Sequence, residues 1–250
     1  MEDDFSDPLS YEERFVVFFD VLGWKSHIKN AGDDPDKIGK LASLPRMMKH
    51  MEGINSGGLD NPDKSQLTSF SDCCVLSRIY DETHLPNLIY GLCRVFIGVA
   101  LQGFLLRAGV TIGKLYHDKN LVFGPALNRA YFLESNTRYP RIRLDTEIES
   151  IKALNLIPNM ISTDEKYGTF IDPYQFDFIK SEYCPNPIPK QEFMGIETDT
   201  DIELFTHLLQ SLELILTKTR NDKCSTEEII DQVNWPYLRV RQQLKRILNP

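Results

Sequence analysis

Residues 15–24, FVVFFDVLGW, decide how the rest of this sequence is interpreted. Five apolar residues run unbroken and are rich in valine and phenylalanine, which predicts a strand buried on both faces. Asp20 then interrupts the run, and a lone carboxylate in a buried strand is costly unless something pairs with it. Gly23 marks the end of the strand and lets a backbone or a ligand come close. Asp20 is therefore either a paired structural acid or a metal ligand at the mouth of a phosphate site.

The composition is that of an ordinary soluble globular protein, with 250 residues, 42% hydrophobic and 26% charged. A net charge of −8 argues against general nucleic-acid binding but leaves a nucleotide substrate open, because a bound metal can outweigh the global sign. Five cysteines without a C-x-x-C pair indicate neither a disulfide framework nor a zinc site. The acidic N-terminus is unlike a signal peptide, and we expect no apolar run of membrane-spanning length. The chain is predicted to be cytoplasmic, with no membrane or nucleic-acid partner.

The apolar patterns predict strands alternating with helices. Residues 25–52 are helical, with breaks at residues 33–35 and at Pro45. Two strands joined by a tight turn place a second lone acid, Asp72, at a hairpin tip. The later elements are a helix over 87–104, a strand over 105–113, a hairpin over 114–122, a helix over 124–134 and a strand over 139–144. This order predicts an α+β fold, a ferredoxin-like (split-βαβ) antiparallel sheet with helices on one face.

The chain divides into three predicted parts. Residues 1–13 are a polar arm, residues 14–145 form the core, and residues 146–250 form a helical and irregular extension packed on that core. The extension has a strand around 169–171, an amphipathic helix over 202–216, and a closing helix preceded by capping residues. The basic residues of the closing helix are either a solvated face or a partner-binding face: Arg239, Arg241, Lys245 and Arg246.

The two lone acids suggest one site. If the strands that end at Asp20 and Asp72 are neighbours at about 4.8 Å, both carboxylates reach one pair of divalent ions. Two-metal phosphoryl chemistry uses ions roughly 3.5–4 Å apart that clamp the attacking and leaving oxygens. The backbone amides at the opening of the following helix, those of Leu22, Gly23 and Trp24, are expected to point at phosphate oxygens.

Four motifs resemble those of class III nucleotidyl cyclase domains, in the family's order and spacing over residues 15–144. In chain order they are FDVLGW at 19–24 beside F-x-D-I-x-G-F, SDC at 71–73 beside G-D-C, RAGVTIG at 107–113 beside R-x-G-I-H-x-G, and GPALNRA at 124–130 with LES at 133–135 beside G-D-x-V-N-x-A with M-E-S. With YHDKNLVFG at 116–124 and YPRI at 139–142, the chain looks most like the bacterial pyrimidine cyclases of anti-phage signalling, which make cyclic UMP or cyclic CMP.

The resemblance implies a role for each matched position. Asp20 and Asp72, helped by the Val21 carbonyl, would hold two Mg²⁺ or Mn²⁺ ions. One ion would activate the ribose 3′-hydroxyl for attack on the α-phosphate, and the other would hold the triphosphate while pyrophosphate leaves. Asn128 would orient the ribose from the opposite subunit, which implies a head-to-tail homodimer with two composite sites.

The sequence lacks one positively charged residue of the family pattern. Phe132 stands where the family has an arginine, four residues after the asparagine. Arg129, adjacent to Asn128, is a second candidate catalytic residue but lies roughly 100° away around the helix. Other sources of the charge are Arg107, Arg141 and Arg143. Among these, Arg141 is predicted to bind phosphate.

The base-reading positions depart as well. Thr68 stands where adenylyl cyclases have a lysine, and Pro125 where they have an aspartate. A threonine hydroxyl can donate or accept, which suits the carbonyls and N–H of uracil, so UTP is preferred over CTP as the substrate. The five histidines lack ligand spacing and are predicted to be surface or hydrogen-bonding residues: His27, His50, His84, His117 and His207.

The favoured hypothesis is a dimeric, metal-dependent pyrimidine nucleotide cyclase that makes a second messenger of anti-phage defence. Both metal acids and Asn128 favour it, since a binding module does not need all three. The loss of arginine at Phe132 favours a rival, a non-catalytic cyclase-like module that senses nucleotide or binds a partner. The third possibility is an α+β scaffold without a nucleotide role.

Overall fold

The computed structural model describes residues 10–55, 65–156, 160–175 and 200–249, and confirms the α+β class. Its strands are β1 (Glu12–Val21), β2 (Ser65–Phe70), β3 (Cys73–Ile79), β4 (Leu106–His117), β5 (Val122–Phe123), β6 (Ile142–Leu144), β7 (Ile161–Asp164) and β8 (Gly168–Ile171). Its α-helices are α1 (Trp24–Ala31), α2 (Pro35–Asn55), α3 (Leu85–Leu101), α4 (Pro125–Ser135), α5 (Thr146–Glu149), α6 (Asp201–Asn221) and α7 (Glu227–Leu248). Within the described ranges, short 3₁₀ helices lie at Glu82–His84, Lys152–Leu156 and Pro173–Gln175.

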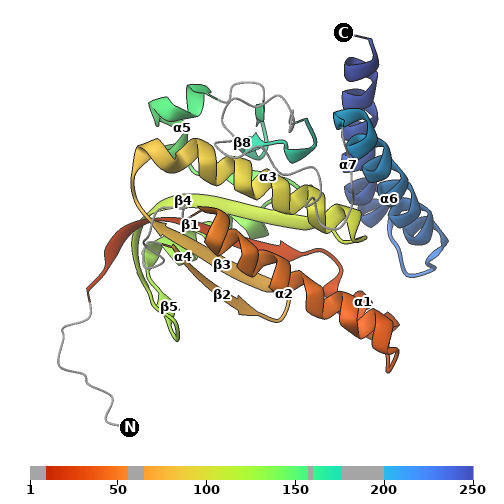
Figure 1. Ribbon diagram of the computed structural model, residues 1–250, viewed down its shortest axis with the longest axis horizontal. Coiled ribbons are helices and arrows are strands. Elements are labelled where there is room, and N and C mark those ends of the chain that lie inside the picture. Colours follow the sequence, from red (N-terminus) through yellow and green to blue (C-terminus); the bar gives the residue numbers. More distant parts are fainter. Residues whose placement is uncertain (1–9, 56–64, 157–159, 176–199, 250) are drawn as a thin grey trace.

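One sheet organises the described chain, with strand order β2-β3-β1-β4-β6-β8-β7 and β5 paired to β4 (Figure 1). The β4–β6 pair is parallel, and the other pairings are antiparallel. The strand β1 lies between β3 and β4, which accounts for its unbroken apolar run.

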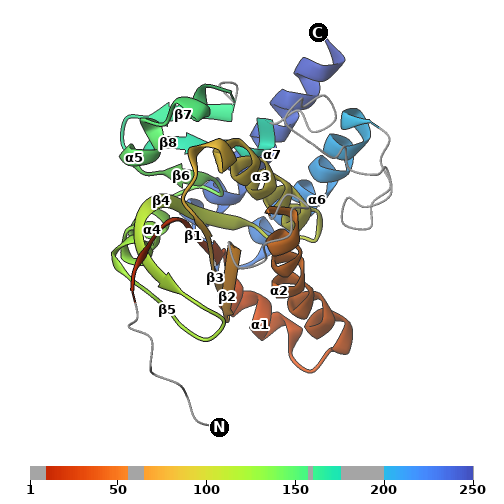
Figure 2. The same cartoon turned by 60° about the vertical axis from the view of Figure 1, so that its left-hand side comes forward.

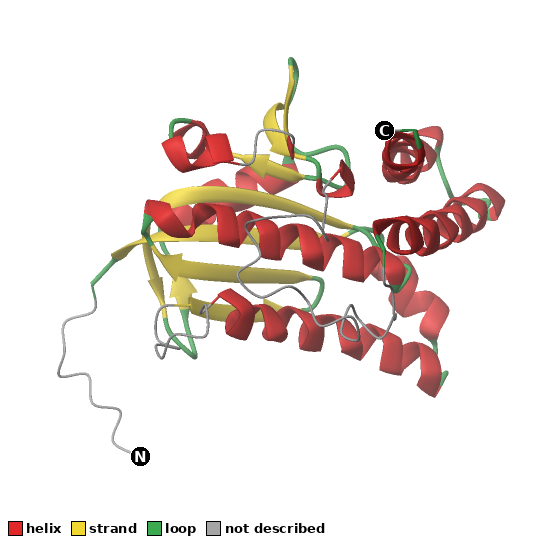
Figure 3. Cartoon of the chain, turned by 45° about the horizontal axis from the view of Figure 1, so that its top comes forward, coloured by secondary structure: helices red, strands yellow, loops and turns green. Residues whose placement is uncertain are grey.

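Helices cover both faces of this sheet, which corrects the expectation of helices on one face (Figure 3). Alternate residues of β1 point in opposite directions. Phe15, Val17 and Phe19 enter the larger core with α2 and α3, whereas Val16 packs with Ala126 and Ala130 of α4. Because both faces of β1 are apolar, a helix layer on only one side would leave the other in water.

The helix α4 packs directly on β4 because of a glycine. A Cβ atom at Gly109 would lie 2.2 Å from the carbonyl oxygen of Ala130 and 2.7 Å from the Cβ of Leu133. Gly124 allows a second close approach, since a Cβ there would lie 2.7 Å from the Lys114 carbonyl oxygen, and its φ is +149°. These two glycines fix α4 against the sheet.

The helical stretch Glu82–Leu101 has the length and apolar composition to cross a membrane, which the sequence reading did not anticipate. The stretch has 20 residues; its 18-residue apolar window has a mean hydropathy of 1.4, and 78% of that window is buried inside the structure. The apolar surface of α3 thus packs in the larger core, between the sheet and α6.

The described part of residues 146–250 continues the core. The strands β8 and β7 extend the sheet from β6, and α6 packs on α3 (Figure 2). The helix α7 is attached by an ion pair of 2.5 Å between Arg239 and the buried Asp172, and by the stacking of Trp235 on Tyr139. The boundary at residue 145 stays a prediction; the sheet and the core both run across it.

The structure also tests the helix breaks. The chain leaves α1 at Ala31 and begins α2 at Pro35, so the predicted break at residues 33–35 is confirmed. Pro45 lies inside α2 without ending it, so the second predicted break is wrong. The strand β1 begins at Glu12, inside the predicted N-terminal arm, and residues 1–9 lie outside the described chain.

Candidate active site

The structure brings the two lone acids together. Asp20 lies at the end of β1, where it pairs with Cys73 of the neighbouring β3 and with Arg107 of β4. Asp72 lies in the tight turn before β3, and its carbonyl oxygen accepts a hydrogen bond of 3.0 Å from the Val21 amide. The strands that carry them are adjacent, as expected. The role of both acids and of the Val21 carbonyl as metal ligands stays a prediction.

The charge on Asp20 is only partly compensated. Its Oδ2 accepts a hydrogen bond of 3.0 Å from Arg107, which lowers its pKa. Burial is the largest single influence and raises the pKa, and the negative charge of Asp72 raises it further. The net result is a raised pKa, so an additional cation at this pair of acids would be stabilising.

A second buried acid shares the same arginine. The Nη2 atom of Arg107 lies 2.8 Å from Oε1 of Glu134 on α4, and its Nη1 donates to the Thr137 carbonyl at 3.2 Å. Glu134 is 3% exposed, and burial raises its pKa to about 7 against the opposing effect of Arg107. Sequence reasoning placed Glu134 only inside the LES motif and gave it no role. Its burial depends on how α4 packs on β4.

The donor set fits a magnesium or manganese ion that arrives with its substrate. Among the described residues, no three His, Cys, Asp or Glu side chains gather as a metal-binding group. Mg²⁺ in phosphoryl-transfer sites usually takes only one or two carboxylates, with substrate phosphates and waters completing its octahedron. Asp20 and Asp72 supply that number of carboxylates, and because the negative charge of Asp72 raises the pKa of Asp20, a cation between them would relieve their repulsion.

Only some backbone amides of the predicted phosphate-binding turn are available to a ligand. The Leu22 amide donates to the Leu105 carbonyl at 2.9 Å, so it is used within the chain in this structure, and its predicted contact with phosphate would require that bond to break. Gly23, with φ of +72°, is the N-cap of α1, and no side chain caps that helix. The amides of Gly23 and Trp24 therefore stay the predicted phosphate donors.

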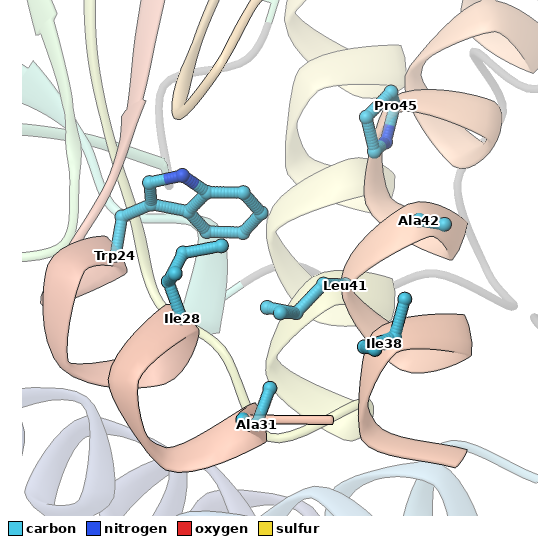
Figure 4. Close-up of a pocket in the computed structure, with 8 residues that line it drawn as sticks. Trp24, Ile28, Ala31, Ile38, Leu41, Ala42 and Pro45 are labelled. Atoms are coloured by element: carbon cyan, nitrogen blue, oxygen red, sulfur yellow. The ribbon is translucent and has the colours of Figure 1, made fainter. Parts of the chain in front are cut away.

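The indole of Trp24 faces elsewhere. It lines an apolar pocket of about 290 Å³ between α1 and α2, with Ile28 and Leu41 among its neighbours (Figure 4). Any contact of Trp24 with phosphate would therefore come from its backbone.

The structure separates the three candidate arginines. Arg141 is 1% exposed, its guanidinium lies 4.0 Å from the ring centroid of Phe170, and Asp164 pairs with it at 3.4 Å. Its assignment to phosphate is not supported, because it is enclosed by these residues. Arg143 donates to the carbonyl of Asn136. Arg107 is the one of the three that contacts Asp20.

Asn128 and Arg129 diverge on α4. Asn128 is exposed and, with Pro125, lines a pocket of about 400 Å³ beside Tyr11 and Phe123. The Arg129 guanidinium instead pairs with Asp145 at 2.5 Å and with Glu147 at 2.9 Å in its own chain. It is held toward α5, so the structure does not support Arg129 as a catalytic residue.

Asn128 lies at the other end of α4 from the acids of its own chain. Glu134 contacts Arg107 beside Asp20, and six residues of helix, about 9 Å of axial rise, separate Glu134 from Asn128. The exposed ring of Phe132, at 64%, lies between them along the helix.

Thr68 lies on the α4 face of the sheet. It pairs with Val75, which packs with Val16 and Ala126 on that face. Its hydroxyl is 2.9 Å from Nε2 of His117. His117 is thus a hydrogen-bonding residue, as predicted, but sequence spacing gave no sign that it would meet Thr68. His50 lies where no side chain is described.

Comparisons with known proteins find likeness to solved cyclase structures. No family model matches the chain, and no curated protein matches it. A bacterial light-regulated adenylyl cyclase is 11% identical with a TM-score of 0.48, over 82% of this chain and 59% of its own length. An adenylate/guanylate cyclase/hydrolase from Silicibacter pomeroyi is 12% identical with a TM-score of 0.42, over 64% of this chain and 94% of its own.

The catalytic core of a rhodopsin-guanylyl cyclase with converted specificity, in complex with ATPalphaS, is also 12% identical with a TM-score of 0.42, over 64% of this chain and 93% of its own. Such values describe a likeness of architecture. The function follows from the chemistry of the site.

Proposed function

We propose that this protein is a metal-dependent nucleotide cyclase with composite active sites, and that its substrate is a pyrimidine nucleoside triphosphate. The observation that carries the proposal is the placement of Asp20 and Asp72 beside each other at the ends of two adjacent strands. Together with the exposed Asn128, these residues match three functional positions of the cyclase motifs.

The acids would hold two Mg²⁺ or Mn²⁺ ions, which when bound lower the pKa of the ribose 3′-hydroxyl and neutralise the triphosphate. The chain contributes position and charge. Asp20 and Asp72 orient the ions, and the amides of Gly23 and Trp24 donate to phosphate oxygens at the start of α1. The ring closure forms the bond between O3′ and the α-phosphorus and releases pyrophosphate.

Arg107 would take over the charge that is missing at Phe132. It is the candidate arginine that contacts Asp20, so it can stabilise negative charge developing at a nearby α-phosphate. Glu134 contacts the same Nη2 atom as Asp20, and the Thr137 carbonyl accepts from Nη1, so both ends of the guanidinium are held in place. In this arrangement the cation comes from the subunit that binds the metals.

The homodimer is proposed because Asn128 lies near the start of α4, whereas Asp20 is linked through Arg107 to Glu134 near the end of that helix. A second copy in head-to-tail orientation would place its Asn128 near Asp20. The exposed aromatic side chains on and beside α4 are consistent with such an interface: Tyr11, Phe123, Tyr131 and Phe132. Tyr131, 56% exposed, also packs edge-on against Phe18 of β1, which orders it for contact.

The choice of a pyrimidine rests on Thr68 and Pro125. Neither can make the charged contacts that a lysine and an aspartate make to adenine in the cyclases that the sequence resembles. UTP is the preferred substrate, cyclic UMP the product, and a signal in bacterial anti-phage defence the proposed role, as the resemblance implies.

The experiment is a panel of the four ribonucleoside triphosphates with Mn²⁺, with cyclic product detected by mass spectrometry. A second step mixes two inactive variants, Asp20→Asn and Asn128→Ala. Random reassortment of head-to-tail dimers gives one intact site in each heterodimer, so activity should return to about one quarter of the wild-type rate. Absence of recovery with mixed dimers present would refute the composite site.

The second candidate function is a non-catalytic module that binds nucleotide in the same cleft. Phe132 favours it, because the exposed ring stands where the resemblance requires an arginine. Binding of a nucleoside triphosphate without formation of any cyclic product in the panel would support this candidate against the enzyme.

A further inference from the structure

A buried chain of hydrogen bonds crosses the sheet and ends at Thr68. The Nε atom of Arg14 donates to the Ser77 hydroxyl at 2.9 Å. That hydroxyl lies 2.8 Å from Nδ1 of His117, and Nε2 of the same ring lies 2.9 Å from Oγ1 of Thr68. The four residues come from β1, β3, β4 and β2, respectively. His117 is at the end of β4, where the hairpin with β5 turns toward β2 (Figure 2).

The first bond fixes the direction of the others. A guanidinium only donates, so the Ser77 oxygen must accept from Arg14. Ser77 is 1% exposed, and its remaining neighbour in the chain of bonds is the His117 ring. If Nδ1 carried a hydrogen, the hydroxyl hydrogen of Ser77 would be buried without an acceptor, which is unfavourable. Ser77 therefore donates to Nδ1.

The ring of His117 is uncharged at neutral pH. Burial and, to a smaller extent, the positive charge of Arg14 lower its pKa to about 4, against the opposing effect of Asp118. A neutral imidazole has one N–H group. Because Nδ1 accepts from Ser77, the hydrogen is on Nε2, and His117 donates to the Thr68 oxygen.

We propose that this relay determines the base that the site accepts, by leaving the hydroxyl hydrogen of Thr68 free to donate to an exocyclic carbonyl. In the opposite tautomer, Nε2 of His117 carries no hydrogen and accepts a hydrogen bond from the Thr68 hydroxyl. The Thr68 oxygen could then only accept a hydrogen bond from the base. The inference rests on the proposed function, in which Thr68 faces the base, and it assigns Arg14, Ser77 and His117 as positioning residues for base selection.

The chemistry favours a keto base over an amino base. Uracil carries an acceptor at O4, and cytosine carries an amino donor at the same position, as guanine and adenine differ at position 6. A donor held in place gains a hydrogen bond with the carbonyl and opposes the amino group. Sites that hydrogen-bond their substrate discriminate strongly against analogues that leave those groups unpaired. We therefore expect UTP to be favoured over CTP, and the preference to depend on residues that never touch the base.

The first test reads the tautomer in the unmodified protein. Long-range ¹H–¹⁵N NMR spectra of ¹⁵N-histidine-labelled protein at pH 7 should show His117 neutral and protonated on Nε2. A ring protonated on Nδ1, or on both nitrogens, would overturn the relay. This measurement requires no activity and no variant, apart from a His117→Gln sample to assign the signal.

The second test compares kcat/KM for UTP and CTP. Ser77→Ala removes the hydrogen that fixes Nδ1 as an acceptor, so the UTP/CTP ratio should fall about tenfold, in line with one misplaced buried hydrogen bond. Thr68→Val should lower the ratio at least as much. Ser69→Ala is the matched control, since Ser69 is the exposed neighbour of Thr68 on the same strand and points to the other face. An unchanged ratio in Ser77→Ala would overturn the inference.

The proposed cyclase function and the proposed relay can be refuted independently of each other. If the wild-type protein forms no cyclic product from any nucleotide, the proposed function is wrong, and calorimetric affinities for UTP and CTP then replace the rate ratio. If the wild-type protein cyclises nucleotides and Ser77→Ala leaves base preference intact, the cyclase assignment stands and the relay is wrong.

Discussion

Asp20→Asn separates the catalytic role of this carboxylate from its role in folding. The substitution removes a negative charge beside Asp72 and keeps an oxygen that can still accept from Arg107. The pKa of Asp20 is raised in the folded state, so this acid costs stability as the pH rises above its unfolded pKa, and the cost is complete above the folded pKa. At pH 7.5 the amide relieves that cost, and we expect the melting temperature to stay within about 3 °C of the wild type or to rise.

The rate should respond in the opposite way. With one of two metal carboxylates gone, the loss should be comparable to that of a preorganised electrostatic group, about 10²- to 10³-fold in kcat, or about 3–4 kcal/mol in the barrier. Higher Mn²⁺ should restore part of the rate if affinity is what was lost. The assay measures cyclic nucleotide against Mn²⁺ concentration, with the exposed Asp33→Asn as a control for charge. Wild-type activity in Asp20→Asn would falsify the metal assignment; a collapsed melting temperature would show that Asp20 is structural.

Three further predictions concern packing, pH and charge. Gly109→Ala should destabilise the fold by about 3 kcal/mol in denaturant unfolding, because its Cβ would meet the α4 backbone, whereas Gly39→Ala, with nothing within 4 Å, should not. The pKa of His117 is lowered to about 4, so stability should be full above pH 6.5 and fall by about 3 kcal/mol as the pH drops to 4, a loss that His117→Gln should abolish. Arg129→Ala should leave cyclase activity within about threefold, and Arg107→Ala should reduce it about 10²-fold; equal losses would contradict the assignment of the charge to Arg107.

Periodicity and motif order gave the strands, the helix break at residues 33–35 and the meeting of the two acids. These features depend on local patterns. An apolar run indicates a strand buried on both faces, and a lone acid at the end of such a strand needs a partner close to that strand end. The helices on both faces follow from the same run, since β1 is apolar in both directions. That consequence was present in residues 15–19, although the expected architecture did not include it.

Local sequence patterns could not predict the partners of the charged side chains. Arg141 is enclosed by Phe170 and Asp164, and Arg129 is paired with Asp145, through strands and helices whose relative placement no motif encodes. The Leu22 amide donates to the Leu105 carbonyl, next to the last β1–β4 pair of Val21 and Leu106, and only the register of these two strands fixes that contact. Pro45 is accommodated within α2, where tertiary packing outweighs its local preference.

By itself, the sequence determined which residues must be buried and which acids must find a partner, because hydrophobic burial and the cost of an unpaired charge act on residue type and spacing. Only the tertiary structure decided which arginine contacts Asp20, which histidine meets Thr68, and that Asn128 lies away from the acids of its own chain. Those pairings join residues up to 87 positions apart in the sequence, and they are set by the register of the strands and the packing of α4 on the sheet.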